Sequence, residues 1–314
     1  HGRFEDTFQH AHPGVTTMWA GMVGYLVAAP DYARMFDTNL GFPYDIHNRI
    51  REMGLSEMDV LNASRTVKVA LQAALFALSL RYLRRMFGEE VAITAGLLIA
   101  LDPFLIAHDR LLHIDGLLAI TSFAAVLALA DAAAFRREAT APWIAAGALA
   151  AVAWLTRSTA VVLIPVAFVA AFYPVASVWR VGAISRAIRP AASRFAWWLG
   201  SAIVVTIALW PALWVSPRTA LGFMIEWSEN AAASGHELPT WFRGEIHFGD
   251  PGPLFYPVSI LWRETPGGML GLALFAGLVL AGPLRRRAHP AARQAIAVVA
   301  LFAGLYLVGM TLGA

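Results

Sequence analysis

The chain holds a dense group of ionisable residues in an otherwise apolar region. From His108 to Gly116 it reads HDRLLHIDG, with long apolar runs on both sides. Charged side chains at membrane depth are costly unless they are paired or line a wet cavity. Asp109 and His113 are four residues apart, so a helix would place them on one face. Arg110 and Asp115 cannot both share that face, and we therefore expect the group to line a cavity from several sides.

An ordinary turn at the membrane interface, with its charges in contact with water and headgroups, is the simpler interpretation. For His108 and Asp109 the two interpretations are equally good. Asp115 lies a further turn into the next helix, and an ionisable residue inside a membrane marks a functional site by default. The functional interpretation is therefore the better one for Asp115.

Further cations are expected at the same end of the membrane helices. Arg157 lies in WLTRSTAVVLIP, and Arg65 and Lys68 begin an apolar run. Cations facing into a bundle would suit a phosphate, because arginine can bind two of its oxygens at once. The alternative is snorkelling to lipid phosphates. Phosphate binding is favoured for Arg157 and Arg110, whereas snorkelling explains Arg65 and Lys68 at least as well.

The histidines near the beginning could ligate a metal, but the pattern is weak. His10 and His12 are separated by one residue, and no completing ligand follows nearby. His236 and His247 could complete such a site only through the fold. HDRLLH differs from the zinc-binding HExxH helix in spacing and lacks its glutamate. We expect no required cofactor, and a divalent metal is left open.

The composition is that of a membrane protein that crosses the bilayer several times. Of the 314 residues 58% are hydrophobic and only 14% are charged, whereas a soluble domain has roughly 25% charged residues. The net charge of +3 does not indicate a nucleic-acid partner, because the arginines fall mostly in short loops between apolar runs. There is no cysteine, which excludes disulfides and thiol chemistry.

The apolar runs predict an all-α bundle of about eight membrane helices over residues 61–314. We expect them near 61–83, 90–107, 111–133, 141–156, 158–178, 195–215, 267–283 and 291–313. Every second connection is rich in arginine, which predicts that those connections are cytoplasmic. Residues 1–60, the short turns near Asp109 and Arg157, and the segment 216–266 then lie on the outer face.

Two outer segments have features of their own. The run 14–29 is short for a span and is flanked by Pro13 and Pro30, so we expect a juxtamembrane helix at the outer interface. The segment 216–266 is rich in Trp, Phe, Pro and Gly, and it reads as a long loop without helices of its own, as binding loops often are. Its aromatic residues suit a sugar or acyl surface and suit an interfacial belt equally well.

Several motifs, in this order, resemble the dolichyl-phosphate-mannose protein mannosyltransferase family. They are HPGVTTMW, the D-R-x4-D of Asp109, Arg110 and Asp115, LTRSTA around Arg157, and GEIHFGDPGPLFYPVSILWRETP. The chain is most similar to the bacterial phospholipid-carrier-dependent branch, which includes aminoarabinose transferases acting on lipid A. The resemblance implies a GT-C fold and inverting sugar transfer from a polyprenyl-phosphate carrier to a lipid, glycan or protein hydroxyl. It also implies a multi-pass protein of the inner or plasma membrane with its active face periplasmic or extracellular.

The resemblance also assigns roles to residues, and it shows that one family motif has no counterpart in this sequence. HPG resembles the element that opens the family's juxtamembrane helix, and Arg110 is implied near the carrier phosphate. The family's principal acid lies in an Asp-Glu pair well upstream, and Glu5 and Asp6 are too close to His12 to replace it. We therefore expect a fragment whose principal acid lies before residue 1, and relatives also continue beyond MTLGA.

The candidate site follows from these motifs. The candidate catalytic residues are Asp115 and Asp109, and the candidate substrate-binding residues are Arg110, Arg157, His12, His108, His113 and His247. The leading alternative is a secondary transporter, which would place charges near the membrane midplane in repeated halves. Here the charges gather at one face and no repeat is visible, which disfavours transport. A structural membrane protein would leave the outer charges without a purpose.

Overall fold

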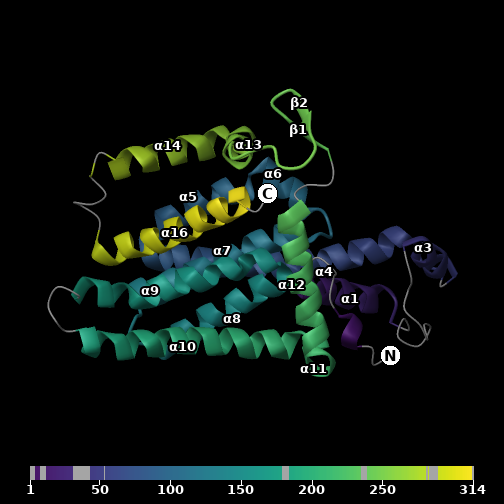
Figure 1. Ribbon diagram of the computed structural model, residues 1–314. Helices are drawn as coiled ribbons and strands as arrows, with labels where there is room; N and C mark the ends of the chain where they lie inside the picture. Colours follow the sequence, from purple (N-terminus) through teal and green to yellow (C-terminus); the bar gives the residue numbers. More distant parts are fainter. Residues whose placement is uncertain are drawn as a thin grey trace.

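The computed structural model describes residues 4–7, 12–30, 43–52, 54–178, 184–234, 239–280, 282 and 289–312, and within them the chain is almost entirely helical (Figure 1). The helices are α1 (Val15–Ala28), α3 (Pro43–Glu52), α4 (Glu57–Phe87), α5 (Glu89–Ala100), α6 (Pro103–Asp109), α7 (Ile114–Ala134), α8 (Thr140–Thr156), α9 (Leu163–Val178), α10 (Ile184–Leu209), α11 (Ala212–Val215), α12 (Pro217–Ser234), α13 (Phe255–Arg263), α14 (Pro266–Leu280) and α16 (Pro290–Leu312). Short 3-10 turns cover Phe4–Asp6 and Ser158–Val162, and an antiparallel hairpin joins β1 (Thr240–Phe242) to β2 (Glu245–His247).

Helix α7 forms the centre of the bundle and packs against α4, α8, α9 and α16. Most of its residues are buried, and many of the buried ones are alanines. Small side chains let helices approach closely in lipid, where packing rather than the hydrophobic effect drives association. The alanine-rich sequence thus produces a tight central helix whose two ends hold the ionisable groups.

The apolar helices agree with the predicted all-α membrane fold. Among the described residues, five helices are long and apolar enough to cross a membrane. They are α4, the run Ser158–Val175, α7, α10 and α16. The pair α5 and α6 would make a sixth. Helices α8 and the apolar part of α14 are shorter, so their crossing remains a prediction.

The predicted continuous helix over 90–107 is broken. Helices α5 and α6 meet at a bend of 64°. Proline has no amide hydrogen and disfavours a helical residue before it, so Pro103 begins a new helix rather than continuing the old one. The Asp102 carboxylate caps that helix by accepting the Leu105 N–H at 2.9 Å. A similar break at Pro211 separates α10 from α11 within the predicted helix 195–215.

Helix α1 lies against α4, α8 and α10 at one end of the bundle. Its Gly21 carbonyl accepts from Ser64 of α4 at 3.1 Å, and its Trp19 donates to the Leu209 carbonyl of α10 at 2.8 Å. A Cβ at Gly24 would overlap the backbone of Ser64, so the close approach requires glycine there. The predicted place of this helix at the outer interface, and its depth in a membrane, remain predictions.

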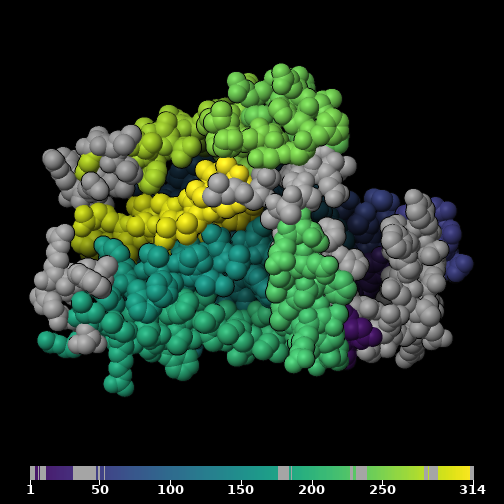
Figure 2. All heavy atoms as spheres, viewed as in Figure 1, coloured from purple at the N-terminus to yellow at the C-terminus, as the bar shows by residue number. Residues whose placement is uncertain are grey.

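The segment 216–266 differs from its expectation as a loop without helices. It contains α12, the hairpin and α13, and Figure 1 shows α12 running crosswise to the bundle. Ala220 of α12 is fully buried in a small cluster with Val15, Leu155 and Trp210. In Figure 2, α12 forms part of the surface at the end of the bundle where α8 and α10 end, and α13 with the hairpin lies above it. Trp241, Phe248 and Trp262 of this segment are largely exposed, so a sugar or acyl surface and an interfacial belt both stay as predictions for them.

Candidate functional site at one end of the bundle

An ion pair between Asp115 and Arg157 stands at the end of the bundle where α7 begins and α8 ends. Arg157 Nη1 donates to Asp115 Oδ1 at 2.5 Å. Asp115 lies in the first turn of α7, where a carboxylate interacts favourably with the helix dipole. Arg157 has an extended backbone between α8 and the following 3-10 turn. The bundle therefore joins two residues that are 42 positions apart.

Arg157 has a further donor that faces no acceptor. Its Nε is buried and makes no hydrogen bond with any described residue. A buried donor without a partner costs free energy. The guanidinium is thus held on one side by Asp115 and can donate to a ligand oxygen on another.

Two histidines lie beside this pair. His113 Nδ1 is 3.2 Å from Asp115 Oδ2 and 3.4 Å from the Asp115 backbone nitrogen. The same nitrogen cannot donate to the carboxylate and accept from the amide at once, and the shorter contact favours donation to the carboxylate. His12 Nδ1 lies 3.3 Å from the Ser158 hydroxyl. Burial and then the charge of Arg157 lower the pKa of His12 to about 4, so it is neutral at neutral pH.

Asp109 belongs to a second group that fixes the turn before α7. Gln72 Nε2 donates to Asp109 Oδ1 at 2.7 Å. Lys68 Nζ donates to the carbonyls of Asp109 at 3.2 Å and Leu111 at 2.8 Å. A Cβ at Gly116 would overlap Asp109 Oδ1, so the carboxylate packs on a bare backbone. The snorkelling interpretation of Lys68 is wrong, because the side chain is fully buried and holds this turn.

Arg110 and His108 are not brought to the ion pair. Arg110 is exposed, and its side chain makes no hydrogen bond or ion pair with the described residues. His108 Nδ1 lies 3.1 Å from the Phe104 carbonyl, and its ring packs on Phe104 at a centroid distance of 4.2 Å. The structure thus joins Asp115, Arg157, His12 and His113 and leaves these two on the neighbouring surface of α6.

The hairpin holds the candidate residue His247, and α13 contributes Tyr256, which was not a candidate site residue. His247 pairs with Thr240 across the hairpin, and its ring centroid is 6.2 Å from that of Phe242. Burial raises the pKa of Tyr256 of α13, and the charge of Arg157 opposes this effect. Tyr256 lies in the GDPGPLFYP motif, which is part of the family resemblance, and that motif could have pointed to it.

A metal centre has no ligand set among the described residues. No three His, Cys, Asp or Glu side chains gather there closely enough to hold an ion. His10 and His236 lie outside the described residues.

A multi-helix membrane bundle with a charged site at one end is the class of protein that these features define. Residues 53–214, just over half of the chain, match the family model of dolichyl-phosphate-mannose-protein mannosyltransferases. The chain belongs to this family, and it is therefore of the membrane glycosyltransferase class. The matched region includes Asp109, Asp115 and Arg157 but ends before Tyr256. No curated protein and no solved structure matches the chain.

Proposed function

We propose that the end of the bundle around Asp115 and Arg157 transfers a sugar from a polyprenyl-phosphate carrier to an acceptor hydroxyl. The observation that carries the proposal is the orientation of Arg157, which is fixed by Asp115 and keeps a buried Nε without a partner. A guanidinium held in this way is preorganised for phosphate oxygens.

The reaction places a growing negative charge where Arg157 can reach it. The acceptor oxygen bonds to the anomeric carbon as the bond from that carbon to the phosphate oxygen breaks, with inversion at carbon. The hydroxyl proton goes to a carboxylate, and the phosphate leaves with the electron pair. Arg157 stabilises the departing phosphate, because a fixed charge in a water-poor site needs no reorganisation during the reaction.

In this proposal Asp115 and Asp109 hold other groups of the site in place and do not take part in the bond changes. Asp115 is committed to Arg157 and His113, so its first task is to hold the guanidinium. Asp109 is bonded to Gln72, and its task is to hold the turn that presents Asp115. The proton acceptor in this proposal is a carboxylate other than these two, as the family resemblance implies.

An apolar groove beside Arg157 suits the carrier's isoprenoid chain. The groove has a volume of about 330 Å³ and is lined by α8, the turn before α9, α9, α10, and parts of α11 and α12. Its lining is apolar apart from Thr206 and includes Trp154 and Val161. Both residues lie within one helical turn or so of Arg157 in the chain. A polyprenyl tail in this groove would place its phosphate near the guanidinium.

The acceptor is proposed to approach from the side of α13. A cavity of about 360 Å³ lies between α5–α6 and α13–α14, and Tyr256 and Asp102 are among its lining residues. The charge of Arg157 acts on the pKa of Tyr256, which supports an approach to the ion pair from this cavity. The arginine-rich connections lie at the opposite end of α7, so the positive-inside rule supports an outer active face.

The test is sugar transfer by the intact protein from a polyprenyl-phosphate-linked sugar to a hydroxyl acceptor, with Arg157→Ala as the variant. Loss of one charge-assisted contact of about 1.5–3 kcal/mol predicts a roughly 10- to 100-fold lower rate. Arg157→Lys should restore only part of the rate, because an ammonium cannot offer two parallel donors.

Arg186→Ala is the matched control, since Arg186 is exposed on α10 at the other end of the bundle. An unchanged rate in Arg157→Ala would exclude this residue from the reaction. Passage of the sugar across the membrane without bond formation would instead support the transporter.

A further inference from the structure

A second polar cavity lies at the opposite end of the bundle. It has a volume of about 1120 Å³ and lies between the α7–α8 connection, α9 and the beginning of α16. Helix α7 has 21 residues, so at 1.5 Å per residue this cavity is about 30 Å from Asp115. It therefore cannot belong to the site around Arg157.

The charges around this cavity are mostly positive. Arg136, Arg137, Arg293 and His289 line it, and Glu138 is the acid among the described lining residues. Glu138 is already bonded to Arg194 at 2.7 Å. Arg136 is bonded at 2.9 Å to Asp131, a fully buried carboxylate that Arg85 also contacts at 3.3 Å. The acids here thus have arginine partners already.

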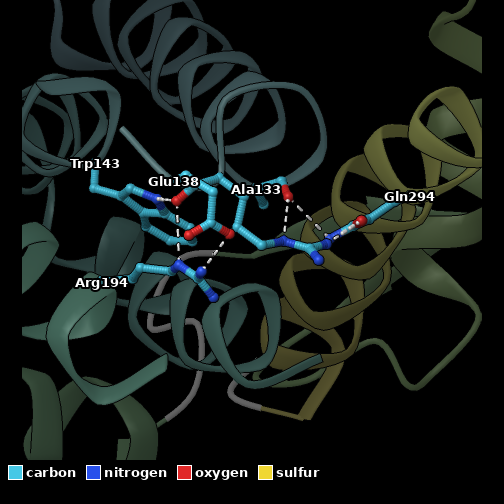
Figure 3. Close-up of polar contacts among 6 residues, drawn as sticks. Ala133, Glu138, Trp143, Arg194 and Gln294 are labelled. Carbon is cyan, nitrogen blue, oxygen red and sulfur yellow. Dashed lines mark hydrogen bonds and ion pairs between the residues drawn. The ribbon is translucent and has the colours of Figure 1, made fainter. Parts of the chain in front are cut away.

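Arg137 is held in place without an acid of its own. Its Nη2 donates to the side-chain oxygen of Gln294 at 2.6 Å, and its Nε donates to the Ala133 carbonyl at 3.1 Å. Gln294 also donates to Ala133, as Figure 3 shows. Both acceptors are neutral, and Nη1 makes no hydrogen bond with the described residues. Burial and then the charge of Arg194 lower the pKa of Arg137, and the nearby Glu138 opposes this effect.

The backbone around Arg137 is equally fixed. Its carbonyl accepts from Trp143 at 3.1 Å and from Arg194 at 3.1 Å (Figure 3). Trp143 is almost fully buried. Several hydrogen bonds thus fix Arg137 at the edge of the cavity. An arginine that only reached toward the membrane surface would not need these contacts.

The lining changes from polar to apolar along the helices. The α7–α8 connection supplies Arg136 and Arg137. The part of the cavity nearer the middle of the bundle is lined by apolar residues of α9 and α16, namely Val169, Ala170, Val298 and Leu301. Leu301 is 11 residues beyond Pro290, which is about 16 Å along the helix. A ligand that fills this cavity should therefore have an anionic end and an apolar end.

We propose that this cavity binds the phosphate headgroup of an anionic phospholipid, with Arg137 as its central contact. The arginine fork matches phosphate oxygens, and the apolar helix faces receive the start of the acyl chains. The volume of about 1120 Å³ exceeds what a bare phosphate ion would fill and lies slightly above the range of ordinary ligand cavities, roughly 300–1,000 Å³. This proposal does not depend on the glycosyltransferase reaction.

The test is lipid binding to the intact protein in detergent, measured by native mass spectrometry. The probes are phosphatidylglycerol, phosphatidylcholine and inorganic phosphate. Phosphatidylglycerol should bind at least about tenfold more tightly than phosphatidylcholine, and Arg137→Gln should remove most of that preference. Arg137→Lys should keep part of it, and Ala297→Trp should weaken binding by filling the cavity from an exposed position that lines it.

Arg186→Gln is the control, because it removes an exposed arginine from the same end without touching the cavity. Equal binding of both lipids, or an equal loss in Arg186→Gln and Arg137→Gln, would overturn the proposal. Tight binding of inorganic phosphate without lipid preference would overturn the lipid assignment. Should Arg137→Gln fail to fold, Ala297→Trp decides, and unchanged lipid binding in that variant contradicts the proposal.

Discussion

Replacing Lys68 by methionine should destabilise the protein and disturb the site without touching it. Methionine has a similar length and no charge, so it fills the space but donates no hydrogen bond. Two carbonyls, those of Asp109 and Leu111, lose their donor. The Asp109 carboxylate is not bonded to Lys68, and its hydrogen bond from Gln72 remains.

The size of the effect follows from these contacts. Each hydrogen bond to a charged group contributes about 1.5–3 kcal/mol, and removal of the buried ammonium returns part of this through its lost desolvation cost. We expect a net loss of about 3 kcal/mol in the free energy of unfolding. Arg81→Met is the control, because Arg81 is exposed on the same helix and its replacement should cost less than about 0.5 kcal/mol.

Reversible unfolding in mixed micelles measures both variants, and sugar transfer measures the site. Lys68→Met should lower the rate even at temperatures where the protein is folded, because the turn that presents Asp115 is loosened. A Lys68→Met protein as stable as the Arg81→Met control would refute the claim that Lys68 holds this turn.

Two further predictions concern neighbouring residues. Gly116→Ala should displace the Asp109 carboxylate and lower stability, whereas Gly200→Ala, at a helical glycine with open space around it, should be harmless in the same unfolding assay. The lowered pKa of His12 means that the unfolded chain binds more protons than the folded one between pH 4 and 6.5. Stability should therefore fall as pH drops through this window, and His12→Gln should flatten the slope; an identical slope in the variant would contradict the buried, neutral histidine.

The helices and the sidedness of the charges could be predicted from the sequence, because both depend on local composition. Apolar runs define membrane helices, and the alternation of arginine-rich connections places Asp115 and Arg157 at one end. Asp115 begins α7 and Arg157 follows the end of α8, so both lie at the same end of the bundle. This was enough to predict that they lie close together.

The remaining contacts depend on packing that no short stretch of sequence reveals. Lys68 looked like a snorkelling residue at a helix end, and its burial arises because α7 and the turn before it cover that face of α4. Arg110 is adjacent to Asp109 in the chain, yet the end of α6 turns it outward. The helices of 216–266 were missed because aromatic, proline and glycine residues suggested a loop, whereas α12 is held by burial of small residues such as Ala220.

The most direct test of the proposed site is a structure of the intact protein with a polyprenyl-phosphate-linked sugar analogue bound. The phosphate oxygens should lie within hydrogen-bond distance, about 3 Å, of Arg157 Nε or Nη2, with the isoprenoid chain along the groove of Trp154 and Val161. A phosphate bound instead in the cavity around Arg137, with no carrier density near Asp115 and Arg157, would contradict the account.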